Sequence, residues 1–271
     1  MFTATPGSLP ADGTPVLADV SLPPGRRIAP EESPDTPVAW ISSAVLPADE
    51  ITALVRALIA AFPITGVWPM HAQGLGHTAD DLDRPWFDGE FDGPDDRTFT
   101  AQQVLDGSFR GDLYDALDED DEFEPELRFT VLADAVDGPD ADPAEIGFDE
   151  PGALLLVPAD RPANTVRELG WYGPANHDLV GEPVSAVLRS WEDRFGALPI
   201  AIAFDTLTLF VPRPPRRSEE GANDGGANDD RLRLLAAEHY AFCPDNIDQG
   251  LAADDYIEGL NTWTHWAFWW D

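Results

Sequence analysis

The sequence predicts an α+β fold, in which helices pack on a mixed or antiparallel sheet and the C-terminal strand is buried in that sheet. Two segments carry apolar residues at helical spacing, and short apolar runs typical of strands lie between and after them. The runs at 200–204 and 207–211 flank Asp205 and Thr206, which is typical of an antiparallel hairpin. Helices and strands are therefore mixed along one chain.

The N-terminal elements follow from prolines and apolar spacing. Residues 1–37 hold eight Pro and are expected to be extended. A helix is expected from Pro47, because acidic residues in a first turn suit the helix dipole, and Pro63 is expected to end it. Its apolar stripe consists of Ile51, Leu54, Val55, Leu58, Ile59 and Phe62. Short strands are expected at residues 16–17, 38–41 and 66–70.

The middle of the chain is strongly acidic. Residues 80–150 carry 25 Asp and Glu against four Arg, so we expect acidic loops or one acidic surface, with an exposed run at 118–126. A strand is expected at 128–132. Residues 88–93 resemble the start of a calcium loop, but Phe99 stands where a ligand Glu is needed, which favours an ordinary exposed loop.

The C-terminal elements have clearer sequence signals than the N-terminal ones. Residues 153–157 form an apolar run typical of a buried strand, and a second amphipathic helix begins at Pro183 and is capped by Gly196. The repeated Gly-Ala-Asn-Asp sequence within 218–230 is typical of a flexible linker. Two more helices and a terminal strand are expected at residues 230–243, 253–260 and 266–270.

These elements suggest three segments within one chain of 271 residues. We predict an extended segment at 1–37, an N-terminal α/β portion with acidic loops at 38–150, and a C-terminal domain at 151–271 that contains the linker. The start of the chain lacks the basic and apolar regions of a signal peptide, and the single Cys fits a reducing cytoplasm.

The net charge of −35 limits the partners. A chain this negative is repelled by phosphate backbones and by anionic membranes, so neither nucleic acid nor membrane is an expected partner. The chain has no Lys, and its 16 basic residues are all Arg. A basic protein is the partner that the charge favours.

One candidate site lies on the helix expected at 230–243. His239 and Cys243 share a face with the core positions Leu232, Leu235 and Ala236. They are either two metal ligands, a catalytic Cys–His pair or buried core residues. Zinc needs two further ligands, and a thiol at a helix C-terminus has its pKa raised by the dipole, so the core interpretation is favoured.

The residues after this helix are polar. Asp245 and Asn246 either form an Asx turn, which is favoured, or a polar corner beside His239. The candidates for catalysis are therefore His239, Cys243, Asp245 and Asn246. No metal site and no cofactor is predicted.

The last nine residues hold four of the nine Trp. Alternation places Trp266, Phe268 and Trp270 on one face of a terminal strand and Trp269 on the other. Large aromatics on both faces predict a strand covered on both sides, at the centre of the sheet. The alternative is an aromatic platform for a ligand. The candidates for binding are His265, Trp269 and Asp271.

The C-terminal sequence resembles the bacterial family catalogued as domain of unknown function 4253, which is common in actinobacteria. The most specific parts are the ending at 266–271 and the run at 237–246; 194–197 and 213–215 add to the resemblance. The resemblance supports a cytoplasmic bacterial protein and implies no mechanism.

Two functions are therefore open. The leading hypothesis is a non-enzymatic, acidic protein-binding module, for example of the immunity or antitoxin type. The alternative is an enzyme that binds a small ligand or a metal through the His, Cys and Asp cluster of the C-terminal domain.

Overall fold

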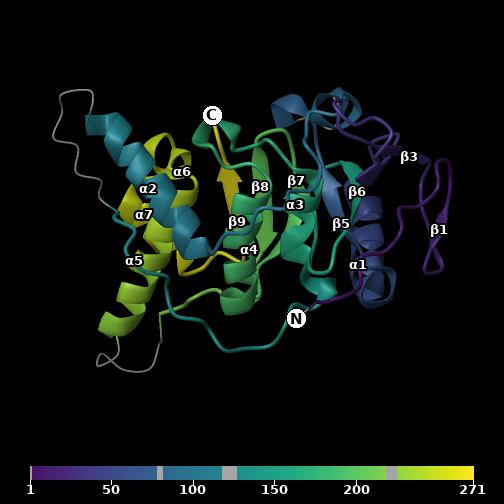
Figure 1. Ribbon diagram of the computed structural model, residues 1–271. Helices are drawn as coiled ribbons and strands as arrows, with labels where there is room; N and C mark the ends of the chain where they lie inside the picture. Colours follow the sequence, from purple (N-terminus) through teal and green to yellow (C-terminus); the bar gives the residue numbers. More distant parts are fainter. Residues whose placement is uncertain (1, 78–81, 118–126, 218–224) are drawn as a thin grey trace.

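The computed structural model describes residues 2–77, 82–117, 127–217 and 225–271, and a mixed seven-stranded sheet forms its centre (Figure 1). The strand order is β3-β4-β6-β5-β7-β8-β9; the β5–β7 pair is parallel and the other neighbouring pairs are antiparallel. The strands of this sheet are β3 (Gly25–Ile28), β4 (Ala39–Ser42), β5 (Val67–Ala72), β6 (Ala153–Pro158), β7 (Leu198–Ile202), β8 (Thr206–Phe210) and β9 (His265–Trp269). The α+β class is confirmed.

Helices and short turns surround the sheet, and β1 (Val16–Leu17) and β2 (Val20–Ser21) form a separate hairpin. The helices are α1 (Ala48–Thr65), α2 (Ala101–Leu117), α3 (Thr165–Leu169), α4 (Glu182–Phe195), α5 (Gly225–Phe242), α6 (Asp245–Asp248) and α7 (Ala253–Leu260). The short helical turns are η1 (Leu75–His77), η2 (Asp83–Phe87), η3 (Pro143–Glu145), η4 (Pro162–Asn164) and η5 (Ala175–His177).

The first helix begins where the sequence predicts but ends later. Pro63 lies inside the last turn of α1, and the helix continues to Thr65. The stop is Gly66, whose φ of 60° is left-handed and whose N–H donates to the carbonyl of Phe62. A proline in a last turn removes one hydrogen bond, whereas a left-handed glycine turns the chain away, so the glycine sets the end.

Three expectations for the first 150 residues need correction. Residues 128–132 form no strand; this segment is irregular, and the N–H of Ala133 bonds to Glu238 at 2.6 Å. Helix α2 was not expected, and β3 joins the main sheet from within the segment expected to be merely extended. The exposed run expected at 118–126 lies outside the described residues.

The two faces of the sheet are covered unequally. Helix α1 covers the face of β5 and β6 that carries His71, because the N–H of Phe148 donates to Thr52 of α1 and the Phe148 ring stacks on His71 at 4.8 Å. Helices α3, α4 and α5 cover the opposite face, where Trp191 of α4 stacks on Phe268 of β9. In Figure 1, α2 lies in front of α4 and α5, so this side is two helices deep.

The C-terminal elements largely follow the sequence. The β7–β8 hairpin, α4 with its Gly196 cap, and α7 all form as expected. Helix α5 begins at Gly225, five residues early, so residues 225–230 of the expected linker are helical; residues 218–224 lie outside the described residues.

The terminal strand is in the sheet, but it is not central. β9 pairs with β8 alone among the described strands and forms one edge. Trp266, Phe268 and Trp270 are buried, whereas His265 is exposed and Trp269 is half-buried. Large aromatic residues on both faces of β9 therefore do not mean that other elements cover both faces. A single half-exposed Trp is common at a protein surface.

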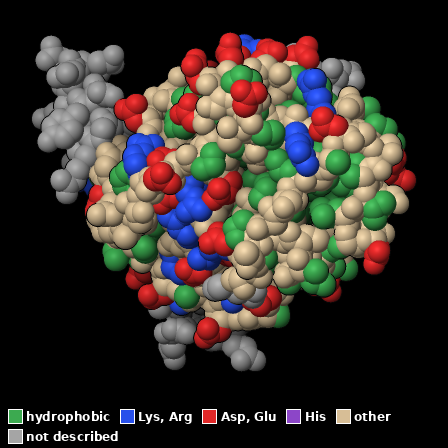
Figure 2. Space-filling model, turned by 45° about the vertical axis from the view of Figure 1, so that its right-hand side comes forward, with side chains coloured by type: hydrophobic (Ala, Val, Ile, Leu, Met, Phe, Trp, Pro, Cys, Tyr) green, Lys and Arg blue, Asp and Glu red, His purple; other side chains and the backbone are tan. Residues whose placement is uncertain are grey.

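Charges are intermixed on the surface. Figure 2 shows Arg side chains set among Asp and Glu side chains on one face, next to a largely hydrophobic area. Arg161 pairs with Glu192 and Asp193, and Arg84 with Glu90. The chain has 51 Asp and Glu against 16 Arg, so acidic side chains outnumber basic ones about three to one. Among the described residues, no helix has the length and apolar content needed to span a membrane.

Candidate functional site

The predicted catalytic residues lie around β9. They are found at the face that α4 and α5 cover and at the strand edge that does not pair with β8. His239 of α5 has no solvent exposure, and its ring lies 4.7 Å from Trp266 and 4.8 Å from Trp191. Its Nδ1 lies 3.0 Å from the Tyr256 hydroxyl, while its Nε2 is buried without a hydrogen-bond partner among the described residues. Burial, reinforced by the nearby Arg194 cation, holds the pKa of His239 well below 6.5, so the ring is neutral at pH 7.

Cys243 follows α5 and is also buried. Its thiol donates to the backbone oxygen of Trp269 at 2.9 Å, and burial raises its pKa to about 12. A neutral, bonded thiol is a poor nucleophile, because the thiolate is the reactive form. His239 and Cys243 thus lie on one face of the chain, as the spacing predicts, but their side chains do not bond to each other: the His239 ring bonds to Tyr256 and the Cys243 thiol bonds to β9.

Asn246 closes the outer edge of β9. Its Nδ2 donates to the oxygen of Ala267 at 2.8 Å, and its Oδ1 accepts from the N–H of Trp269 at 3.2 Å. The side-chain amide therefore takes the place of a neighbouring strand. The Asx turn expected here does not form, because α6 begins at Asp245 with no side-chain cap and both side chains bond to other segments.

Asp245 holds the end of the chain. Its Oδ2 accepts from the N–H of Asp271 at 3.1 Å and lies 3.2 Å from Nε2 of His177. Asn176 donates to the backbone oxygen of Asp271 at 2.8 Å. No local sequence pattern links Asn176 and His177 to the end of the chain, because more than 90 residues separate them from Asp271.

Neither the acidic loop nor the cluster has the geometry of a metal centre. In the loop at 88–93, Phe91 is buried and Asp92 accepts from the Tyr172 hydroxyl, so the loop is attached to the core. Within the described ranges, no group of three or more His, Cys, Asp or Glu is arranged to hold a metal ion.

The predicted binding residues lie on the other side of β9. On this face of β7, β8 and β9, which we call the open face, Ala201, Thr206, Thr208 and Trp269 are half-buried and His265 and Ala267 are exposed. Cross-strand pairs place Ala201 beside Thr208 and Thr208 beside Ala267. None of the described helices covers these residues, in contrast to the α4 and α5 side.

A recess of about 200 Å³ lies where the open face meets the covered part of the sheet. His71 and Phe148 form one side, His265 the other, and Thr206 and Thr208 line it between them. The His71 ring packs over the backbone of Gly152, where a Cβ would lie only 2.2 Å from its Nε2. Glycine is therefore required at 152 for His71 to take this position.

Two carboxylates accompany the two histidines of the recess. Glu150 and Asp149 both line it, and each acts electrostatically on one imidazole: Glu150 on His71 and Asp149 on His265. Burial lowers the pKa of His71, opposed by hydrogen bonds to the backbone of Glu150 and Pro151 and by the Glu150 charge. Partial desolvation lowers the pKa of the more exposed His265, opposed by the Asp149 charge. At pH 7 the recess thus combines two neutral rings with two exposed negative charges. His71, Asp149 and Glu150 were missed from sequence, because they lie on segments that only the fold brings to β8.

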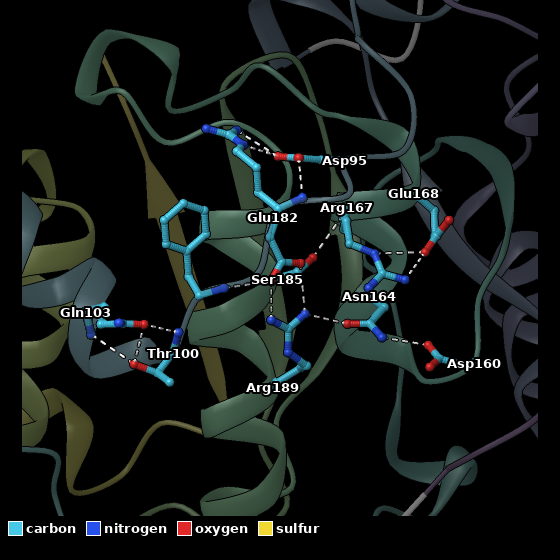
Figure 3. Close-up of polar contacts among 12 residues, drawn as sticks. Asp95, Thr100, Gln103, Asp160, Asn164, Arg167, Glu168, Glu182, Ser185 and Arg189 are labelled. Atoms are coloured by element: carbon cyan, nitrogen blue, oxygen red, sulfur yellow. Dashed lines mark hydrogen bonds and ion pairs between the residues drawn. The ribbon is translucent and has the colours of Figure 1, made fainter.

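A separate polar network holds α4 against η4 and α3 (Figure 3). Arg189 bonds to Glu182 within α4 and to Oδ1 of Asn164 at 2.8 Å, and Asn164 in turn donates to Asp160 at 2.6 Å. Ser185 accepts from the N–H of Arg167 at 2.9 Å. These charges are satisfied by one another, which is the pattern of a structural network rather than of a vacant site.

The fold and this geometry define an α+β protein with one mixed sheet, whose last strand is closed at its edge and open on one face. Residues 153–271 match the family model described as Domain of unknown function (DUF4253). The matched part, which is less than half of the chain, is similar to that family, as the sequence motifs suggested. It begins at Ala153, the first residue of β6, which lies between β4 and β5 in the sheet. Comparisons with curated proteins and with solved structures gave no match.

Proposed function

We propose that this protein is a binding module for a basic segment of another protein, and that the segment lies across the open face of β7, β8 and β9. The observation that carries the proposal is the uncovered sheet face, whose recess is bordered by Asp149 and Glu150 in a chain of net charge −35. An immunity or antitoxin protein would be one example of this class.

Charge favours a basic partner over a second copy of the chain. Two molecules of charge −35 repel each other, whereas a Lys- and Arg-rich segment gains from the same field. The half-buried Trp269 lies on the open face and offers a ring on which a cationic side chain can stack.

Edge pairing is a weaker alternative to binding on the face. A peptide that extended the sheet at β9 would need the backbone groups of Ala267 and Trp269 that Asn246 already holds. Binding across the face leaves these bonds intact.

The enzyme hypothesis has less support than binding. A catalyst in the cluster would need a reactive group in contact with substrate, but His239 is fully buried and Cys243 is a bonded thiol with a raised pKa. The recess of about 200 Å³ is also smaller than the roughly 300–1,000 Å³ of typical small-molecule pockets.

The test is to titrate the full chain with a pool of fluorescent Arg- and Lys-rich peptides and with an acidic pool of matched length. We expect the basic pool to bind, with an affinity that falls as NaCl is raised. Ala267→Arg adds bulk and charge to the open face and should weaken binding at least tenfold, while Ile64→Arg, at a position 87% exposed on α1, should not. Equal binding by both variants, or no binding of the basic pool, would overturn the proposal.

A further inference from the structure

The recess between His71 and His265 lies on the open face, and its lining differs from the rest of that face. Aromatic and imidazole rings form its sides, two Thr hydroxyls line it, and two carboxylates border it. This combination is more specific than a general acidic surface, because it pairs flat rings with anions at one place.

We propose that the recess is a pocket for a single arginine side chain of the bound partner, with its guanidinium beside Asp149 and Glu150. This inference rests on the proposed function and adds the chemical group that is recognised.

The size of the recess supports one side chain. A volume of about 200 Å³ is too small for a typical small-molecule ligand but suits the end of one long amino-acid side chain. The recess opens onto the face where a partner segment would lie, so a side chain can enter while its backbone remains on β8 and β9.

The lining supports arginine over lysine. A guanidinium is planar, stacks on flat rings, and donates to two carboxylates from one rigid group. His71 and Phe148 already stack with an interplanar angle of 26°, which places a flat ring pair at one side of the recess. Lysine offers a compact, strongly hydrated charge that uses carboxylates but gains less from rings.

The two histidines of the recess do not repel a cation when their rings are neutral. At pH 7 both rings are mainly neutral, because desolvation lowers their pKa below 6.5. The recess then presents the two carboxylates without an opposing histidine charge. Arg56, which is the nearby cation on α1, is directed to the carbonyl of Ile146 at 2.5 Å.

The experiment uses single-residue probes, so that it does not depend on any partner peptide. N-acetyl-arginine-N-methylamide, its lysine counterpart and its uncharged citrulline counterpart are each titrated into ¹⁵N-labelled full chain at pH 7. We expect saturable amide shifts at Thr206, Thr208 and Glu150 with the arginine probe, an at least threefold weaker response with lysine, and no saturation with citrulline.

The matched variants separate the recess from general acidity. Asp149→Asn with Glu150→Gln should abolish the response to arginine, whereas Asp134→Asn with Glu145→Gln removes the same charge from exposed positions outside the recess and should preserve it. Equal responses to arginine and citrulline, equal responses to arginine and lysine, or a response that survives the recess variant would each overturn the inference. The peptide titration tests the proposed function separately. If basic peptides bind and Ala267→Arg weakens that binding, the proposed function stands even when the arginine inference fails.

Discussion

The two faces of β9 differ in burial and in what they contact. One face contributes Trp266, Phe268 and Trp270 to an aromatic core with Trp191 and Phe242, and the other presents His265, Ala267 and Trp269 to the surface. Both faces belong to the same five residues and the same hydrogen bonds. The difference separates the stability that the covered side supplies from the recognition that we propose for the open side.

The largest expected effect comes from removing both faces together. Deleting residues 266–271 uncovers Leu207, Leu209 and the Trp191 ring, which are buried now. We expect the C-terminal half to unfold, because losing three buried aromatic side chains, at about 3–5 kcal/mol each, removes an amount comparable to the roughly 5–15 kcal/mol by which domains are stable. Tryptophan fluorescence and circular dichroism during heating provide the measurement. Cooperative melting near the parent temperature would show that β9 is dispensable and favour a purely ligand-binding role.

A matched pair of single substitutions separates the two faces. Phe268→Ala should cost about 3–5 kcal/mol of unfolding free energy, because it empties a site packed by Trp191, His239 and Phe242. Trp269→Ala, one residue along, should cost only about 1 kcal/mol, because its ring is half-exposed. Urea unfolding measures both values. Equal costs would mean that the open face is covered in solution.

The smallest effect concerns the pH dependence of the covered face. The pKa of His239 in the folded chain lies well below 6.5, so the unfolded chain binds a proton more readily, and stability is lost as pH falls from 6.5 toward the folded pKa. The slope from this residue is up to about 1.4 kcal/mol per pH unit. His239→Phe keeps an aromatic ring in place and should flatten the curve of unfolding free energy over that interval. The other titratable groups remain in both proteins, so an unchanged slope in the variant would show that His239 does not contribute to it.

Sequence patterns predicted the elements that have strong local signals. Helix α4, with its stripe from Val184 to Phe195 and its Gly196 cap, and the β7–β8 hairpin are clear because spacing and turn residues agree. Helix α2 was missed because its apolar periodicity is weak; the available signal was Thr100, whose hydroxyl and N–H bond to Gln103 in a capping box. Strand β3 gave no signal, because Arg26 and Arg27 interrupt its apolar pattern.

The site was predictable only in part. Alternation correctly sorted Trp266, Phe268 and Trp270 from Trp269, but it cannot say whether a strand is central or at an edge, since that depends on pairing with distant segments. The composition of the cluster suggested chemistry at His239 and Cys243, whereas the contacts of both residues are with Tyr256 and the backbone of Trp269. The recess joins β5, β8, β9 and residues 147–150, which are separated by up to about 200 positions and share no local pattern.

The side-chain amide of Asn246 also affects whether further chains can add to the edge of the sheet at high protein concentration. An exposed edge strand rich in aromatic residues is a template on which further chains can add, and β9 would otherwise offer such a template at the end of the sheet. By occupying the oxygen of Ala267 and the N–H of Trp269, one side chain prevents open-ended growth of the sheet from molecule to molecule. An aromatic strand that helps to hold the fold together can therefore lie at the rim of the sheet without making the protein prone to aggregate.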